Sequence, residues 1–190
     1  KPDNYEKHME DTMNAGNFLN DRQVVEMVVS QGPKQIQQLL SWGANFDKTQ
    51  GGKFDLAKEG GHSEHRVLHH KDNTGNEIQN TLIRRVTEHK NITVLDHHFA
   101  IDIITQHHLG KIVTRYDKDI ECFGAYVMNL NTKELMTVLS KVTMIATGGS
   151  GNLYHTTTNP SIATGDGIAM GYRAKGLVKH REVMQLHPTS

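Results

Sequence analysis

A short glycine cluster, Thr147-Gly148-Gly149, is the first feature of this sequence that could do chemistry. It directly follows an uninterrupted apolar run at residues 142–146, which is typical of a strand buried on both faces of a sheet. Glycines at the carboxyl end of a strand let the backbone approach a phosphate-bearing ligand, and open α/β sheets bind ligands at that edge. The same glycines could equally form a simple turn, and the dinucleotide fingerprint G-x-G-x-x-G is absent from the chain.

A second cluster, Thr-Gly-Asp-Gly at residues 164–167, precedes a predicted helix over residues 168–175. An aspartate between glycines at a helix start could accept hydrogen bonds from a hydroxyl or a ring nitrogen of a ligand. Asp166 could instead cap the helix, because aspartate oxygens accept from the first free N–H groups of a helix. Spacing alone leaves both interpretations open.

The thirteen histidines raise the question of a metal site. Several occur as doublets, at residues 69–70, 97–98 and 107–108. Neighbouring side chains of a strand point to opposite faces, so a doublet offers only one ligand to a given site. Neither His-Glu-x-x-His nor Cys-x-x-Cys occurs, so we predict no metal site. The serine hydrolase signal Gly-x-Ser-x-Gly is absent as well.

The composition indicates a globular protein, with 36% hydrophobic and 22% charged residues. Lysine plus arginine and aspartate plus glutamate number 21 each, so charge favours neither nucleic acid nor an anionic membrane as partner. The lone cysteine, Cys122, fits a reducing compartment, and no apolar run reaches the roughly 18 residues of a membrane span. We therefore predict a cytoplasmic protein. The first residue is not methionine and no closing element precedes Ser190, so both ends look cut.

Hydrophobic periodicity predicts the elements that must position the two glycine clusters. Helices are expected over residues 4–20, from the Asn20-Asp21 cap onward, from Pro33 to Gly43, and over residues 75–89. Residues 46–73 are polar and rich in turns, and no regular structure is predicted for them.

The second half of the chain is dominated by runs with a period of two, which is typical of strands. Strands are expected at residues 92–95, 99–104, 112–114, 122–128, 135–139 and 142–146. The run between residues 110 and 140 predicts a β-meander. The sum is a mixed α/β unit with the meander inserted before a central strand.

Five motifs in a fixed order resemble the flavoprotein family of succinate dehydrogenase, fumarate reductase and L-aspartate oxidase. They are Glu59-Gly-Gly-His-Ser63, Ala146-Thr-Gly-Gly149, Thr157-Thr-Asn-Pro160, Thr164-Gly-Asp-Gly-Ile-Ala-Met170 and Gln185-Leu-His187-Pro-Thr189. The resemblance covers essentially the whole chain. It implies an internal fragment of a Rossmann-like FAD-binding domain with an inserted β-meander. The family's N-terminal dinucleotide-binding strand and capping domain would lie outside the chain.

In this interpretation residues 1–190 form one partial FAD-binding domain. Residues 1–45 would be a helical segment and residues 110–140 the meander. Residues 141–190 would contain the central strand, the FAD-proximal loops and the His-Pro-Thr motif.

The segment around Glu59 resembles the L-aspartate oxidases within this family. It reads Lys58-Glu59-Gly-Gly-His-Ser63-Glu-His-Arg66-Val-Leu-His69. Aspartate differs from succinate by an α-ammonium group, which the Glu59 carboxylate could bind by a charge-assisted hydrogen bond. The implied activity is FAD-dependent oxidation of L-aspartate to iminoaspartate, with oxygen or fumarate as acceptor. The alternative is a fumarate reductase or succinate dehydrogenase flavoprotein subunit, with membrane or iron–sulfur partners.

The resemblance also implies which residues bind the substrate and a non-covalent FAD. The cofactor residues would be the backbone of Phe99 and Ala100 at the adenine end, Asp166, and the turn of Thr147, Gly148 and Gly149. His187 would contact a substrate carboxylate, although a histidine before proline can also be purely structural. The catalytic arginine of the family is expected beyond Ser190.

The resemblance further implies a place in NAD synthesis, because iminoaspartate feeds quinolinate. Quinolinate synthase would then be a functional partner. A third possibility is that residues 1–190 alone form an inactive folding or interaction module, because the pyrophosphate loop of the family is missing from them. Such a fragment would expose core surface and is expected to self-associate.

Overall fold

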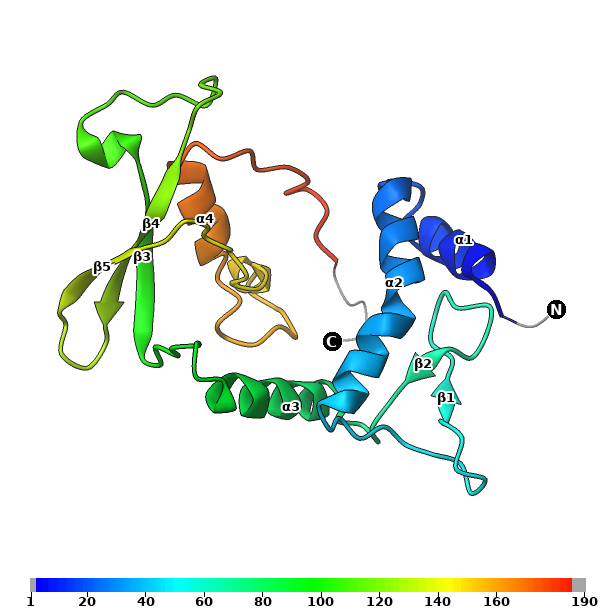
Figure 1. The fold of residues 1–190 in the computed structure, drawn as a ribbon. Helices are drawn as coiled ribbons and strands as arrows, with labels where there is room; N and C mark the ends of the chain where they lie inside the picture. The colour runs from blue at the N-terminus through cyan, green and yellow to red at the C-terminus, as the bar shows by residue number, and fades with distance from the viewer. Residues whose placement is uncertain (1–2, 186–190) are drawn as a thin grey trace. The chain divides into compact units, whose positions relative to one another are not determined.

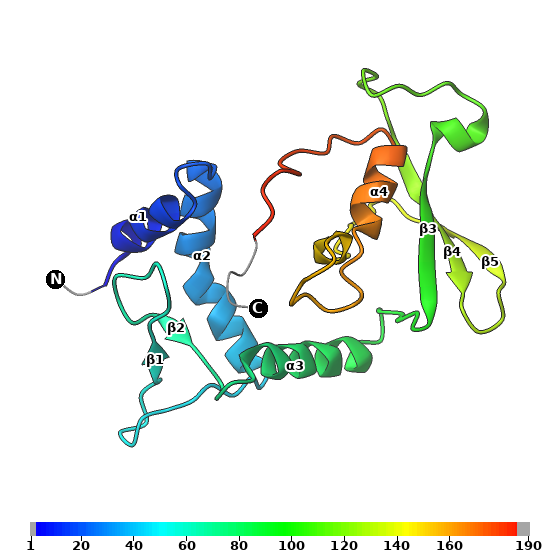
Figure 2. The ribbon, with the colours of Figure 1, turned by 180° about the vertical axis from the view of Figure 1, so that it is seen from behind.

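The computed structural model describes residues 3–185 and divides the chain into two compact units. The first unit spans Lys1–Val94 and the second spans Leu95–Ser190. Figure 1 and Figure 2 show that both units combine helices with a small antiparallel sheet, in agreement with the predicted mixture of helix and sheet.

Two helices form the core of the first unit. Helix α1 (Tyr5–Ala15) begins after Asn4, whose side chain accepts a hydrogen bond from the Lys7 amide. Helix α2 (Arg22–Ser41) begins after Asp21, as predicted, and the Asp21 carboxylate accepts from two amides of the first turn. The buried side chains between them are Met13, Val25 and Val29, with Met9 packed alongside.

The predicted bounds of the first helices are wrong in two respects. Helix α1 ends at Ala15 rather than residue 20, because Asn17 and Phe18 adopt positive φ angles of 50° and 59°. Helix α2 continues through Pro33, where a separate third helix was expected (Figure 1). A proline inside a helix removes one backbone hydrogen bond. The apolar residues of α2 nevertheless continue at helical spacing beyond Pro33.

A short hairpin follows in the segment where no regular structure was predicted. Strands β1 (Leu56–Ala57) and β2 (Val67–Leu68) pair antiparallel and enclose the loop that carries Glu59. Helix α3 (Thr74–Glu88) then forms as predicted. The expected strand at residues 92–95 does not form.

A three-stranded antiparallel sheet forms the centre of the second unit, in the order β3-β4-β5. Its strands are β3 (His98–Thr105), β4 (Cys122–Asn129) and β5 (Leu135–Leu139), which confirms the three corresponding predicted strands. Residues 112–114 form no strand, and they lie instead in the loop after a 3-10 turn, η1 (Gln106–Leu109). The sheet therefore begins at β3, before residues 110–140, for which the β-meander was predicted.

Helix α4 (Asp166–Arg173) packs against β3. The Arg173 guanidinium donates to the Ile101 carbonyl at 2.8 Å and to the Asp102 carboxylate at 3.3 Å. The predicted central strand at residues 142–146 is not formed. A strand needs a hydrogen-bonded neighbour, and the part of the chain that the structure describes supplies none here, so Val142 and Met144 are 82% and 87% exposed.

Candidate functional site

The structure brings the two glycine clusters together in the second unit. The Gly165 amide donates to the Gly149 carbonyl at 3.1 Å. A Cβ atom on Gly165 would lie 3.0 Å from Cβ of Ser150, and one on Gly167 would lie 2.0 Å from Oγ1 of Thr147. Only glycine permits this close approach of the Thr147 turn to the start of α4.

The outer side of this turn is open. Cβ atoms built on Gly148 and Gly149 would meet no atom within 4 Å, and Gly148 has a φ of +77°. The turn therefore exposes backbone that a ligand can approach closely. These features fit the predicted role of Thr147, Gly148 and Gly149.

Asp166 is the first residue of α4 and does not cap it. The cap position belongs to Gly165, and no side chain caps this helix end. One oxygen of Asp166, Oδ2, accepts from the Thr164 hydroxyl at 2.9 Å. The other oxygen has no hydrogen bond from the described residues, and the side chain is exposed. The capping interpretation is therefore wrong, and the carboxylate can accept a hydrogen bond from a ligand.

The loop between the two glycine clusters is closed by asparagines that sequence reasoning did not single out. The Asn152 amide donates to the Ala163 carbonyl at 2.9 Å, and its side chain donates to the Pro160 carbonyl at 2.5 Å. Asn159 donates twice to the Thr157 hydroxyl, each at 3.1 Å. Thr157, Asn159 and Pro160 belong to one of the five motifs that carry the family resemblance. The position of this motif between the two glycine clusters could have indicated that it supports the loop.

Phe99 and Ala100 lie near the start of β3. They pair with Met128 and Val127 of β4, and a register shift follows between Ala100 and Asp102. Phe99 is 42% exposed and Ala100 is half-buried. Because Arg173 ties α4 to β3 just beyond these two residues, all six cofactor candidates belong to one connected unit.

Glu59 lies in the first unit, on the loop between β1 and β2. Its carbonyl accepts from the His62 amide at 3.1 Å, which makes a tight turn in which Gly61 has a φ of +84°. The side chain is exposed and has no hydrogen bond or ion pair within residues 3–185. It is thus available to a cationic group. His187, the other predicted substrate residue, lies outside the described residues.

A partly buried ion-pair cluster beside the Glu59 loop was not predicted from the sequence. Arg66 lies between the carboxylates of Asp3 and Asp11, with shortest distances of 2.7 and 2.5 Å. Asp11 also accepts two hydrogen bonds from Ser63. The signal was present, since Ser63 and Arg66 belong to the Glu59 motif, but nothing in the sequence indicated Asp11 as the partner.

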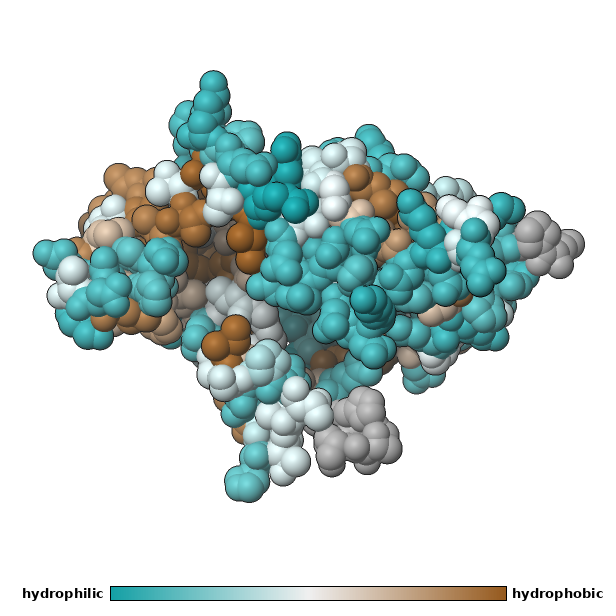
Figure 3. Space-filling view, turned by 90° about the horizontal axis from the view of Figure 1, so that it is seen from below, coloured by the Kyte–Doolittle hydropathy of each residue, from teal (hydrophilic) through white to brown (hydrophobic). Residues whose placement is uncertain are grey.

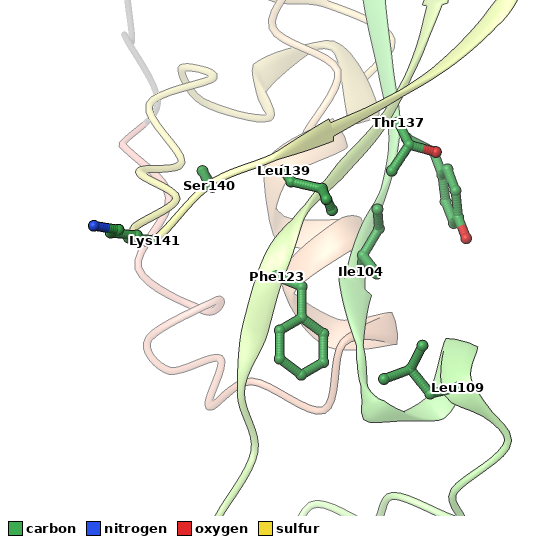
Figure 4. A pocket seen from close by; sticks show the side chains of 8 residues that line it. Ile104, Leu109, Phe123, Thr137, Leu139, Ser140 and Lys141 are labelled. Carbon is green, nitrogen blue, oxygen red and sulfur yellow. The ribbon is translucent and has the colours of Figure 1, made fainter.

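Two hollows lie away from the cofactor candidates. The one in the second unit, of about 590 Å³, lies on the sheet beside η1 (Figure 4). It is lined mainly by apolar side chains, among them Ile104, Phe123 and Leu139. The one in the first unit, of about 990 Å³, is bounded by α1, α2 and the β1–β2 hairpin. None of the predicted site residues that the structure describes lines either hollow.

The described residues, 3–185, contain neither a candidate metal cluster nor a candidate membrane-spanning helix. No group of three or more histidine, cysteine, aspartate or glutamate side chains is placed to hold a metal ion. No helix in this part of the chain has the length and apolarity of a membrane span.

Similarity to a known protein family identifies the domain that contains the glycine turn. The family model described as FAD binding domain matches residues 1–190. The chain belongs to this FAD-binding domain family. FAD is the cofactor of the family, and the open glycine turn with the available oxygen of Asp166 fits such a ligand.

The curated relatives of this FAD-binding chain include several L-aspartate oxidases. It is 44% identical over 188 residues to the chloroplastic L-aspartate oxidase 2-b of Nicotiana tabacum, which covers 99% of this chain and 28% of the relative. It is 40% identical to the L-aspartate oxidase of Acinetobacter baylyi, over 100% of this chain and 34% of the relative. The chain thus spans about a third or less of these relatives.

Solved structures with the same fold include fumarate reductases. The quinol fumarate reductase of E. coli matches with a TM-score of 0.82 and 28% identity, over 91% of this chain and 28% of that one. A flavocytochrome c3 fumarate reductase in an open conformation matches with a TM-score of 0.74 and 26% identity, over 91% and 30%.

Proposed function

We propose that this chain is part of an L-aspartate oxidase, which oxidises L-aspartate to iminoaspartate with FAD and passes electrons to oxygen or fumarate. The similarity to named L-aspartate oxidases, at 38–44% identity over nearly the whole chain, carries this proposal. The identity to the fumarate reductases of known structure is lower, at 26–28%.

The proposed cofactor residues act through their backbone and one carboxylate. Thr147, Gly148 and Gly149 lie against the bound, non-covalent FAD, and Asp166 accepts a hydrogen bond from it. The backbone of Phe99 and Ala100 contacts its adenine end. When bound, FAD supplies the acceptor for the hydride that leaves the substrate. The β3–β5 sheet is then an insertion in a Rossmann-like domain.

The proposed substrate residues distinguish aspartate from succinate. The Glu59 carboxylate, which is exposed and has no hydrogen bond or ion pair among residues 3–185, pairs with the α-ammonium group. His187 binds a substrate carboxylate. Succinate offers no cation, so an unneutralised Glu59 would repel a dicarboxylate. Holding both ends of aspartate orients the bond that is oxidised, and such orientation contributes much of an enzyme's rate.

A flavin subunit of a fumarate reductase or succinate dehydrogenase is the second candidate, because the similar solved structures include quinol fumarate reductases. Membrane or iron–sulfur partners would then follow. Under the first candidate we propose a place in NAD synthesis, with quinolinate synthase as the enzyme that uses the product. The cytoplasm remains our expectation for the compartment, and the plant relatives are named chloroplastic.

Anaerobic flavin reduction in the full-length protein tests the proposal. Aspartate should bleach the flavin absorbance and succinate should not. Glu59→Gln should raise the aspartate concentration needed, whereas Glu64→Gln, which removes an acid of the same loop, should leave it unchanged. Equal reduction by succinate, with Glu59→Gln without effect, would support the second candidate instead.

A further inference from the structure

Arg66 is the centre of a partly buried ionic cluster with Asp3 and Asp11 in the first unit. Its side chain is only 8% exposed. It binds Asp3 in bidentate fashion, with Nε at 2.9 Å from Oδ2 and Nη2 at 2.7 Å from Oδ1. Its third nitrogen, Nη1, lies 2.5 Å from Oδ2 of Asp11. Paired guanidinium–carboxylate contacts of this kind are among the strongest and most directional in proteins.

Asp11 connects this cluster to the loop that carries Glu59. Its Oδ2 atom accepts from both the backbone amide and the hydroxyl of Ser63, at 2.8 and 2.9 Å. The Ser63 amide and the Arg66 guanidinium hold the pKa of the Asp11 carboxyl well below its ordinary value. Asp11 is therefore charged at neutral pH. Its carboxylate on α1 binds Ser63 and Arg66 of the loop and so holds the loop against α1.

The Glu59 loop is held at its base as well. The Arg66 amide donates to the Ala57 carbonyl at 3.1 Å, directly beside the β1–β2 pair. A Cβ atom on Gly61 would lie 3.6 Å from Cβ of Ala15, so the turn rests against the end of α1. Within residues 3–185, the Glu59 side chain makes no hydrogen bond or ion pair that would fix it. Its position must therefore come from Ser63 and Arg66 on the same loop.

We propose that Asp11, acting through Ser63 and Arg66, is a positioning residue that holds the Glu59 carboxylate where it meets the ammonium group of the substrate. This inference rests on the proposed function. It assigns a role in substrate specificity to a residue of α1 that lies 52 positions before Ser63 in sequence.

The same loop offers a matched control. Glu64 forms an ion pair with Lys7 of α1 at 2.5 Å, but these side chains are 35% and 31% exposed. Water screens a pair that is about one-third exposed, and its two long side chains lose entropy, so this pair contributes less to structure than the contacts of Arg66, whose side chain is 8% exposed. Glu64→Gln thus removes one carboxylate from the same loop and leaves the Asp11 cluster intact.

A double-mutant cycle in the full-length protein tests the proposal by the kinetics of aspartate oxidation. Asp11→Asn keeps the shape of the side chain and removes its charge. We expect it to raise KM for aspartate about tenfold and to change kcat less than about twofold, because only substrate placement is lost. In the Glu59→Gln background the same change should raise KM by less than about twofold, since the residue it positions is gone. Glu64→Gln should change neither constant.

Additive effects of Asp11→Asn and Glu59→Gln would overturn the proposal, because Asp11 would then act independently of Glu59. So would a fall in kcat and flavin content with KM unchanged, which would indicate a purely structural role. Failure of the wild-type protein to oxidise aspartate would instead overturn the proposed function, and with it the substrate role of Asp11.

Hydrogen exchange tests the anchoring without reference to activity. Asp11→Asn should speed exchange of a peptide covering residues 58–66 severalfold, because the Ser63 amide loses its charged acceptor. Peptides from α3 and the Glu64→Gln variant should exchange as in the wild type. Unchanged exchange of residues 58–66 in Asp11→Asn would contradict the anchoring itself.

Discussion

Gly167 shows how a single missing methyl group shapes the candidate cofactor site. It lies in the first turn of α4, where an added Cβ would stand 2.0 Å from Oγ1 of Thr147 and 2.6 Å from Cγ2 of Ile145. Gly171, one turn later in the same helix, has no atom within 4 Å of an added Cβ. The two glycines therefore separate the effect of close packing from the general effect of glycine in a helix.

Gly167→Ala should lower the free energy of unfolding by about 1–3 kcal/mol, because the Thr147 turn must move away from α4. The full-length protein should also retain less FAD. Gly171→Ala should stabilise the protein by roughly 0.5–1 kcal/mol, since alanine has the higher helix propensity. Urea denaturation and the flavin-to-protein absorbance ratio measure both effects. Equal stability of the two variants would contradict the packing of Thr147 on α4.

The lowered pKa of the Asp11 carboxyl predicts how the stability of the folded protein changes at acid pH. Its pKa lies below the ordinary value of 3.8 because of the Ser63 amide and Arg66. An unfolded chain therefore binds a proton here more readily than the folded one, so the stabilisation is present above about pH 4 and is lost as the pH falls further. The Asp11→Asn variant should lose less stability than the wild type on acidification from pH 5 to pH 3.

Thermal unfolding of both proteins across this pH range measures the difference. Asp3 and Glu64 also have lowered pKa values through Arg66 and Lys7, so the variant should keep part of the acid dependence. Parallel curves for wild type and Asp11→Asn would exclude Asp11 as a contributor.

Elements with a complete local signal were predictable from sequence, and elements that depend on distant partners were not. Helix α3 and strands β3, β4 and β5 carry their own periodicity, and all four formed at nearly the expected residues. The run at residues 142–146 is as apolar as a central strand, but no described strand lies beside it. Backbone hydrogen bonds with neighbours, which a local pattern does not reveal, decide whether such a run becomes a strand.

In the candidate site, too, the contacts between residues close in the chain were predictable, and those between distant residues were not. The motifs placed Thr147, Gly149 and Asp166 in one unit, because they lie close together in the chain. The contact of Asp11 with Arg66 spans 55 positions and has no local signature. It follows only from the folded structure, which brings Asp11 of α1 next to Arg66 of the β1–β2 hairpin.

Pro33 provides a test of the largest error at the level of elements. The structure places it inside α2, where its ring removes one hydrogen bond and crowds the preceding turn. Pro33→Ala should therefore stabilise the protein, by roughly 1–3 kcal/mol. If Pro33 instead opened a separate helix at its first position, the same change would be neutral or destabilising.

Urea denaturation followed by circular dichroism at 222 nm measures this change. Lys34→Ala is the control, because it alters the next residue of α2 without affecting a backbone donor. A loss of stability in Pro33→Ala would contradict a continuous α2.

At the scale of the whole molecule, the second unit exposes many large apolar side chains. Figure 3 shows hydrophobic side chains gathered over this unit, at the left of the view. The exposed apolar side chains of β5 and of the segment after it are Leu135, Val138, Leu139, Val142, Met144 and Ile145. β5 is also an edge strand, paired only with β4 among the described strands. Apolar surface beside an open sheet edge favours association.

We therefore expect residues 1–190, produced alone, to self-associate as their concentration rises. Val142→Lys combined with Met144→Lys should weaken this association, because both side chains are more than four-fifths exposed and their replacement leaves the packing of the unit intact. Asn91→Lys combined with Asn131→Lys adds the same charge at exposed polar positions and should have little effect. Light scattering over a range of concentrations measures the assembly. A monomer at every concentration would contradict the prediction, and equal effects of the two double variants would attribute the association to net charge rather than to the apolar run after β5.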